Sequence, residues 1–167
     1  MTFSLHAAAV PAFLRGLNSL SGLADKAIAT GRSDADLLGS RLAADMKPLS
    51  AQFQMASFGP VAAVARLAGV AVPSMPDDET SLVQIKDRIA RAVAFVEGVD
   101  PSAFEGAETR RVELRFPGVE LNFHGAGFLT SFALPNFYFH LTAVYAILRK
   151  EGVELGKRDF LGNLDLI

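Results

Sequence analysis

The sequence contains no cysteine and no tryptophan, and only three of its 167 residues are histidine. Without cysteine the chain can form no disulfide bond, no thiolate nucleophile and no thiolate metal site. Its histidines, His6, His124 and His140, supply few imidazole ligands for a metal centre. The composition agrees with a reducing compartment, and we expect a cytoplasmic protein.

The sequence also lacks an excess of charge and a long apolar run. A formal net charge of −2 gives no bulk attraction to nucleic acid or to an anionic membrane, so we expect neither as a partner. No apolar stretch reaches the roughly 20 residues that span a bilayer. The apolar segment 3–20 has no basic leading region and is interrupted by Pro11, so we do not expect a secretory signal. We expect one domain over residues 1–167.

Apolar residues at three- and four-residue spacing predict four long helices. The predicted ranges are 5–28, 48–68, 81–97 and about 125–151. Ser4 is expected as the first N-cap, Thr80 or Ser81 is expected to start the third helix, and Gly69 is expected as a stop. Prolines at positions 11, 60 and 135 are expected to kink or restart these helices. A short helical turn is predicted within 33–38, a loop at 72–78 and an ordered tail from 153.

A β-hairpin is predicted between the third and fourth helices. Residues 111–116 and 119–123 alternate polar and apolar on either side of Pro117-Gly118. The charged residues of the third helix, Arg88 among them, are expected to form a solvated face. Together these elements predict an all-α fold, a four-helix bundle with a small β-hairpin inserted before the fourth helix.

The fourth helix carries an unusual pair of polar residues. It is apolar on nearly every side, yet Asn136 and His140 lie four residues apart and therefore on one face. A polar pair in an apolar surround must find partners or cost free energy. The pair is therefore either a hydrogen-bonded core network that fixes helix register or part of a ligand site.

Motifs for specific chemistry are weak. The Asn136–His140 spacing suits a helical ligand pair, but an amide is a poor ligand for zinc or nickel. The chain has no Glu-x-x-His motif, no Gly-x-Ser-x-Gly elbow and no phosphate-binding lysine motif. Gly125 and Gly127 are expected to permit a tight turn from the hairpin into the helix. The residues leave open whether the protein is an enzyme.

Four segments resemble an uncharacterised bacterial family, a domain of unknown function in the DinB/YfiT-like superfamily, whose members are regarded as metalloenzymes. The resemblance extends over almost the full length and rests on segments 10–17, 45–49, 134–140 and 155–162. It implies a bundle with up-down-down-up topology, a long crossover between the second and third helices, and a homodimer.

The resemblance also implies where a metal would lie. Superfamily members with a metal typically use one histidine on the second helix and a His-x-x-x-His pair on the fourth. Those positions fall near Gln52 and on Asn136 and His140. One histidine of three is thus retained, and His140 is the best single candidate for a metal ligand.

Three hypotheses follow. The first is a small-molecule-binding bundle with a degenerate or absent metal site, its pocket holding His140, Asn136, Gln52, Asp45 and Tyr145. The second is a non-catalytic structural or interaction protein that retains the bundle. The third, by superfamily analogy alone, is a metal- or thiol-dependent transferase or isomerase with Zn or Ni as its divalent ion.

Overall fold

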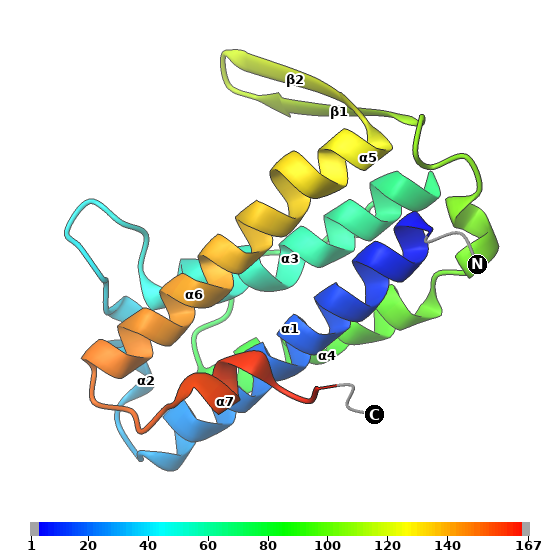
Figure 1. Ribbon diagram of the computed structural model, residues 1–167. Helices are drawn as coiled ribbons and strands as arrows, with labels where there is room; N and C mark the ends of the chain where they lie inside the picture. The colour runs from blue at the N-terminus through cyan, green and yellow to red at the C-terminus, as the bar shows by residue number, and fades with distance from the viewer. Residues whose placement is uncertain (1–3, 165–167) are drawn as a thin grey trace.

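A computed structural model of the chain describes residues 4–164 and is mostly helical (Figure 1). The long helices are α1 (Leu5–Ala29), α3 (Leu49–Ala68), α4 (Leu82–Gly98) and α6 (Leu134–Lys150). Helix α1 contacts α4 and α6, and α3 contacts the same two helices. Their apolar faces share one buried core. The four predicted helical regions are confirmed to within a few residues.

The helices begin and end at the residues that the sequence favours. The Ser4 hydroxyl accepts a hydrogen bond from the Ala7 backbone N–H at 3.2 Å and caps α1. Ser81 and Gln84 form a capping box at the start of α4. Gly69 ends α3 with φ +71°, a left-handed conformation that glycine adopts without a steric penalty.

The three prolines act differently. Helices α1 and α3 continue through Pro11 and Pro60. The fourth helical region instead has three parts, α5 (Gly125–Gly127), the π-helical segment η2 (Phe128–Ala133) and α6, and Pro135 lies in the first turn of α6. The backbone at Gly127, Ala133 and Leu134 is right-handed helical, so the helix type changes just before Pro135 without a break in the chain's helical conformation, and the π-helical turn was not predicted.

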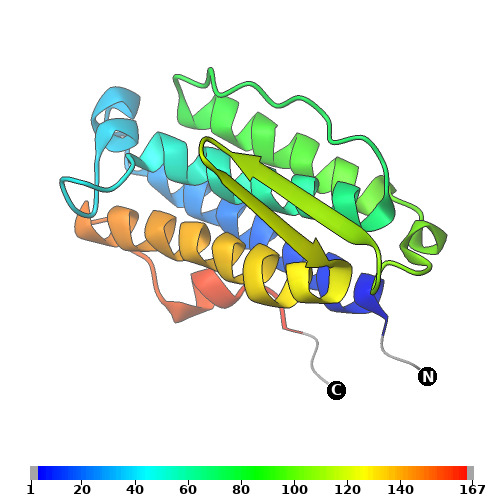
Figure 2. The same cartoon turned by 90° about the horizontal axis from the view of Figure 1, so that it is seen from above.

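The predicted hairpin is confirmed and lies over α3 and α6 (Figure 2). Strands β1 (Arg111–Phe116) and β2 (Val119–His124) pair antiparallel, and Val112 and Leu114 of β1 are buried. Phe123 of β2 contacts the rings of Phe128 and Phe132, with centroids 5.9 and 6.1 Å apart. These contacts attach the hairpin to η2.

Gly125 fixes the approach of the hairpin to the helices. A Cβ atom at this position would lie 1.9 Å from the Ala107 carbonyl oxygen, too close for any side chain. At Gly127 the corresponding space is open. The tight turn thus requires only the first of the two glycines, and the requirement is for space.

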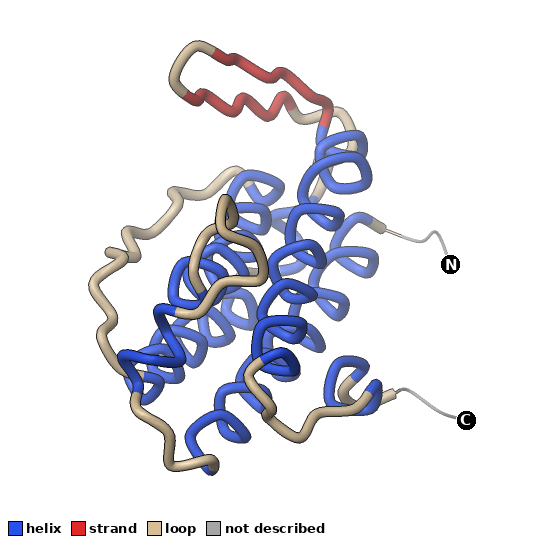
Figure 3. The backbone as a smooth tube through the Cα atoms, turned by 90° about the vertical axis from the view of Figure 1, so that its left-hand side faces the viewer, coloured by secondary structure: helices blue, strands red, loops and turns tan. Residues whose placement is uncertain are grey.

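Shorter elements complete the fold. They are α2 (Asp34–Gly39), the 3-10 helix η1 (Pro101–Phe104) and α7 (Lys157–Leu161). Residues 69–81 form a long connection that returns along the molecule from the end of α3 to the start of α4 (Figure 3). Among residues 4–164 no helix combines the length and the apolar character that a membrane crossing requires.

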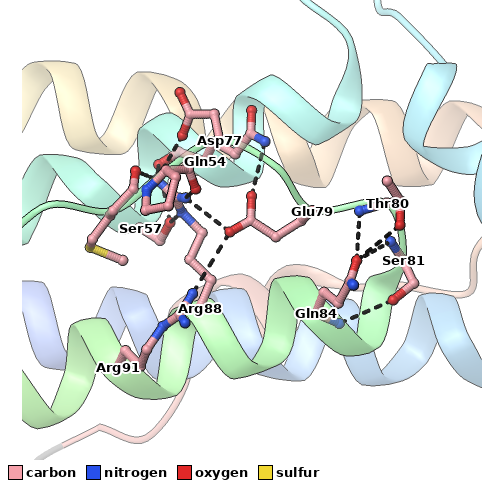
Figure 4. Close-up of polar contacts among 11 residues, drawn as sticks. Gln54, Ser57, Asp77, Glu79, Thr80, Ser81, Gln84, Arg88 and Arg91 are labelled. Atoms are coloured by element: carbon pink, nitrogen blue, oxygen red, sulfur yellow. Dashed lines mark hydrogen bonds and ion pairs between the residues drawn. The ribbon is translucent and has the colours of Figure 1, made fainter.

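One charged residue of α4 is buried, contrary to the prediction of a solvated face. The Arg88 side chain is 1% exposed. Its Nε donates to Ser57 Oγ at 2.8 Å, and its Nη1 donates to Glu79 Oε1 at 2.9 Å and to the Pro76 carbonyl at 2.7 Å (Figure 4). Its Nη2 lies 2.9 Å from Asp77 Oδ1. Arg88 therefore ties the 69–81 connection to α3 and α4.

The carboxylate that faces Arg88 is almost as buried. The Glu79 side chain is 3% exposed, and its second oxygen accepts a hydrogen bond from Gln54 Nε2 at 3.0 Å. Burial alone would raise the pKa of this carboxyl group, but the hydrogen bonds from Gln54 and Arg88 outweigh it and hold the pKa below its ordinary value. The polar groups of this cluster satisfy one another, which indicates a structural role.

Candidate functional site

A hydrogen bond across the α3–α6 interface joins two of the predicted site residues. His140 Nδ1 on α6 lies 2.8 Å from Gln52 Oε1 on α3. Gln52 is 2% exposed, and its Nε2 donates to the Lys47 carbonyl at 3.3 Å. Because that carbonyl can only accept, the Lys47 contact fixes the orientation of the carboxamide and presents its oxygen to the imidazole.

This geometry defines the state of the imidazole. A carboxamide oxygen only accepts, so Nδ1 of His140 carries the proton and Nε2 of the neutral ring keeps its lone pair. His140 is half-buried, and burial lowers its pKa below the ordinary value. At neutral pH the site thus offers an uncharged acceptor that could also act as a general base.

His140 and Asn136 both line a cavity of about 410 Å³. Its walls come from α3, η2, α6 and strand β1, so the hairpin covers the space between the two helices (Figure 2). Asn136 lies one turn before His140, as the spacing predicted, and a Cβ at Gly59 would lie 4.0 Å from its Nδ2. Within residues 4–164 the Asn136 amide makes no hydrogen bond, so it is free to bind a ligand.

Most of the remaining wall is apolar. Its apolar residues come from α3, β1 and η2 and include four phenylalanines: Met55, Phe58, Gly59, Ala62, Ala63, Leu114, Phe116, Phe128, Phe132 and Ala133. Cavities of roughly 300–1,000 Å³ with apolar walls and a few convergent polar groups are typical of small-molecule sites.

The cavity wall also contains two charged residues, Arg66 and Arg115, which were not predicted from the sequence. Arg66 lies 14 residues after Gln52, and at about 100° per residue the two project from nearly the same side of α3. A helical projection of α3 from Gln52 would therefore have found Arg66. No comparable signal existed for Arg115, because only the tertiary placement of the hairpin brings it to the cavity.

The structure does not bring Asp45 or Tyr145 to this cavity. Asp45 is exposed in the turn before α3. Tyr145 packs against Phe160 of the C-terminal segment, with ring centroids 5.9 Å apart. Of the five predicted pocket residues, His140 and Asn136 line the cavity and Gln52 supports it from the α3–α6 interface.

The donor set does not fit a zinc or nickel ion. The three positions that the superfamily would use carry two carboxamides and one imidazole, and the imidazole Nδ1 is engaged by Gln52. Within residues 4–164 no group of three or more His, Asp or Glu residues is placed to hold a metal ion. We therefore derive no metal-dependent step from these residues.

The other two histidines lie elsewhere. The ring of His6 packs edge-on against Phe104, with centroids 5.2 Å apart. His124 is exposed at the end of β2, where its Nδ1 lies 3.0 Å from the Thr109 carbonyl. Neither residue lines the α3–α6 cavity, so His140 is the histidine that contributes to its wall.

Comparisons with known proteins agree with this architecture. A crystal structure described as a DinB family member protein from Shewanella denitrificans superposes with a TM-score of 0.87 at 37% sequence identity. The similarity covers 98% of this chain and 94% of that chain. A comparison with curated proteins found no match. The profile of a domain of unknown function, DUF1993, matches residues 5–161, and the chain therefore belongs to this uncharacterised DinB-like family.

Proposed function

We propose that this chain is a small-molecule-binding protein whose ligand lies in the cavity between α3, α6 and the hairpin. The observation that carries the proposal is the 2.8 Å hydrogen bond between His140 Nδ1 and Gln52 Oε1. It holds a neutral imidazole in the wall of a mostly apolar cavity of about 410 Å³. In this proposal the superfamily's metal positions are retained as an organic-ligand site.

The proposed scaffold is a single-domain DinB/YfiT-like four-helix bundle with up-down-down-up topology. Its support is the pattern of helix contacts, in which α1 and α3 each pack against both α4 and α6. The long 69–81 connection is the crossover that such a topology needs between parallel neighbours. This arrangement places α3 beside α6 and so creates the cavity.

Binding of a neutral apolar probe tests the proposal. N-phenyl-naphthylamine, whose fluorescence increases in apolar surroundings, should bind with one equivalent per chain. Gly59→Leu should abolish that binding, because the new side chain projects toward Asn136 and fills the cavity. Gly22→Leu is the matched control, since a Cβ there meets open space on α1. Equal probe binding by both variants would contradict the proposal.

A second experiment distinguishes ligand binding from a structural role for the Asn136–His140 pair. If the cavity is a binding site, His140→Ala should weaken probe binding while the protein remains folded. If the pair only fixes helix register, the same substitution should lower the melting temperature and leave probe affinity in the folded protein unchanged. Circular dichroism and fluorescence titration on one sample distinguish the two outcomes.

A second candidate function, interaction with another protein copy, is favoured by one surface feature. Tyr138, Phe139 and Ala143 of α6 line a shallow apolar groove together with Leu42 and Met46, and Phe139 is 58% exposed. We extend the proposal to a homodimer that buries this groove. Light scattering should give the dimer mass for the wild type and the monomer mass for Phe139→Asp. A monomeric wild type would contradict it.

A further inference from the structure

The cavity contains a cation without an acidic partner. The Arg66 guanidinium is half-buried and lines the cavity, and its Nη1 donates to the Ala62 carbonyl at 3.1 Å. Within residues 4–164 no carboxylate forms an ion pair with Arg66, and none lines the cavity. A guanidinium has five N–H donors, so most of the hydrogen-bonding capacity of Arg66 remains unused by the protein.

Burial of an unpaired guanidinium costs free energy that a bound anion would recover. Burial in fact lowers the pKa of Arg66 below its ordinary range. Arg115 adds a second cation from the hairpin, but its Nη2 already lies 3.1 Å from Glu113 Oε2 and its side chain is 73% exposed. Arg66 is therefore the group for which a ligand anion would matter most.

The polar groups of the cavity are separated along the helices. Met55 and Arg66 both line it, and the rise of 11 residues of α3 corresponds to about 16 Å. Because α6 packs along α3 with His140 opposite Gln52, the imidazole lies toward the start of α3 and Arg66 toward its end. Phenylalanines from α3, β1 and η2 line the space that they share.

From this arrangement we infer that the ligand is an elongated organic anion with an apolar body. Its carboxylate, sulfonate or phosphate oxygens would pair with Arg66, and the apolar body would lie against Phe58, Phe128 and the neighbouring aromatic rings. A hydrogen-bond donor at the far end would meet Nε2 of His140. This inference rests on the proposed binding function and specifies the class of ligand.

Two probes with one skeleton test the inference. Anilinonaphthalene sulfonate is an anion, and N-phenyl-naphthylamine is its neutral counterpart. The wild type should bind both, and only the affinity for the sulfonate should fall as salt is raised. Arg66→Gln should lower the affinity for the sulfonate by about tenfold and should change the affinity for the neutral probe by less than about twofold. Arg66→Lys should restore part of the sulfonate affinity.

Arg15→Gln, which removes an exposed arginine of α1, is the matched control and should leave both affinities unchanged. Equal effects of Arg66→Gln on the two probes, or no effect on either, would overturn the anion inference while cavity binding itself stands. If neither probe binds, or if Gly59→Leu fails to abolish binding, the proposed function fails and the inference fails with it. If Arg66→Gln does not fold, two other measurements test the anion inference. They are the salt dependence of sulfonate binding by the wild type and the sulfonate affinity of Arg66→Lys.

Discussion

His140 Nδ1 lies 2.8 Å from Gln52 Oε1, and Gln52 Nε2 in turn donates to the Lys47 carbonyl. This chain of contacts orients the imidazole from the start of α3 and leaves Nε2 as its unprotonated nitrogen. Its two side chains stand at or near positions where the superfamily resemblance implies metal ligands. The hydrogen-bonding chemistry of the imidazole in the cavity follows from this relationship.

The lowered pKa of His140 predicts a defined pH dependence of stability. Because the folded protein binds this proton less tightly than the unfolded chain, protonation favours unfolding. The His140 contribution should be complete above the ordinary pKa of 6.5 and should be lost as pH falls from there to the lower pKa of the folded state. Urea unfolding as a function of pH measures it.

His140→Gln should flatten the stability profile in that window, while His124→Gln, at the exposed end of β2, should leave it unchanged. A wild-type profile that is already flat between neutral pH and the onset of acid unfolding would contradict the account of a buried neutral imidazole.

The Arg88 cluster predicts a large and asymmetric loss of stability. Arg88→Met leaves the Glu79 carboxylate buried without its cation and should reduce the free energy of unfolding by about 3–5 kcal/mol. Arg91→Met, at an exposed position on the same helix, should cost less than about 1 kcal/mol. Denaturant titration measures both, and equal losses would show that Arg88 is not the residue that holds the crossover.

Acid should act on the same cluster. The pKa of Glu79 is held below its ordinary value of 4.5, so its stabilising contribution is present above that pH and is lost as pH falls through the lower folded-state pKa. Glu79→Gln should remove this part of the acid sensitivity, and Glu97→Gln on the exposed face of α4 should not.

Two helical glycines predict different responses to the same substitution. A Cβ at Gly16 would lie 2.5 Å from the Phe137 ring, whereas a Cβ at Gly59 would project into the cavity, 4.0 Å from Asn136 Nδ2. Because Gly59 precedes Pro60, whose ring disfavours a Cβ on the preceding helical residue, Gly59→Ala should gain little from helix propensity and should change the stability of the protein by less than about 1 kcal/mol. Gly16→Ala should destabilise it by about 1–3 kcal/mol through overpacking. Thermal unfolding of the two variants tests the assignment of close packing to one and open space to the other.

The donor set predicts that the purified protein holds no stoichiometric zinc or nickel. One imidazole and two carboxamides form too weak a site to retain either ion through dialysis. Elemental analysis should give far less than one equivalent, and a chelator should leave the melting temperature unchanged. One equivalent of metal that disappears in His140→Ala would contradict this expectation.

Much of the fold could be predicted because local signals agreed with tertiary packing. Ser81 and Gln84 cap α4 at the predicted start, and Gly69 ends α3 in the one conformation that favours glycine. Gly118, with φ +77°, supplies the hairpin turn that the Pro-Gly pair predicted. The Asn136–His140 pair located the cavity because two polar residues on an apolar helix face need a partner or a ligand.

The remaining features depend on segments far apart in sequence. Arg88 was predicted to lie on a charged surface. Its partners, Glu79 and the Pro76 carbonyl, lie in an irregular connection whose path the sequence does not indicate. Its spacing from Ile85 and Ala92, both buried, was the available signal. Asp45 and Tyr145 were predicted pocket residues, but their side chains belong to the exposed turn and to the contact with Phe160.

The most direct test of the central claim is a nitrogen-detected NMR spectrum of the His140 ring, recorded while N-phenyl-naphthylamine is added. The account predicts a neutral ring protonated at Nδ1 at pH 7, and an Nε2 resonance that shifts as the probe saturates one site while His124 stays fixed. A His140 ring that is protonated on both nitrogens, or that is unchanged while the probe binds, would contradict it.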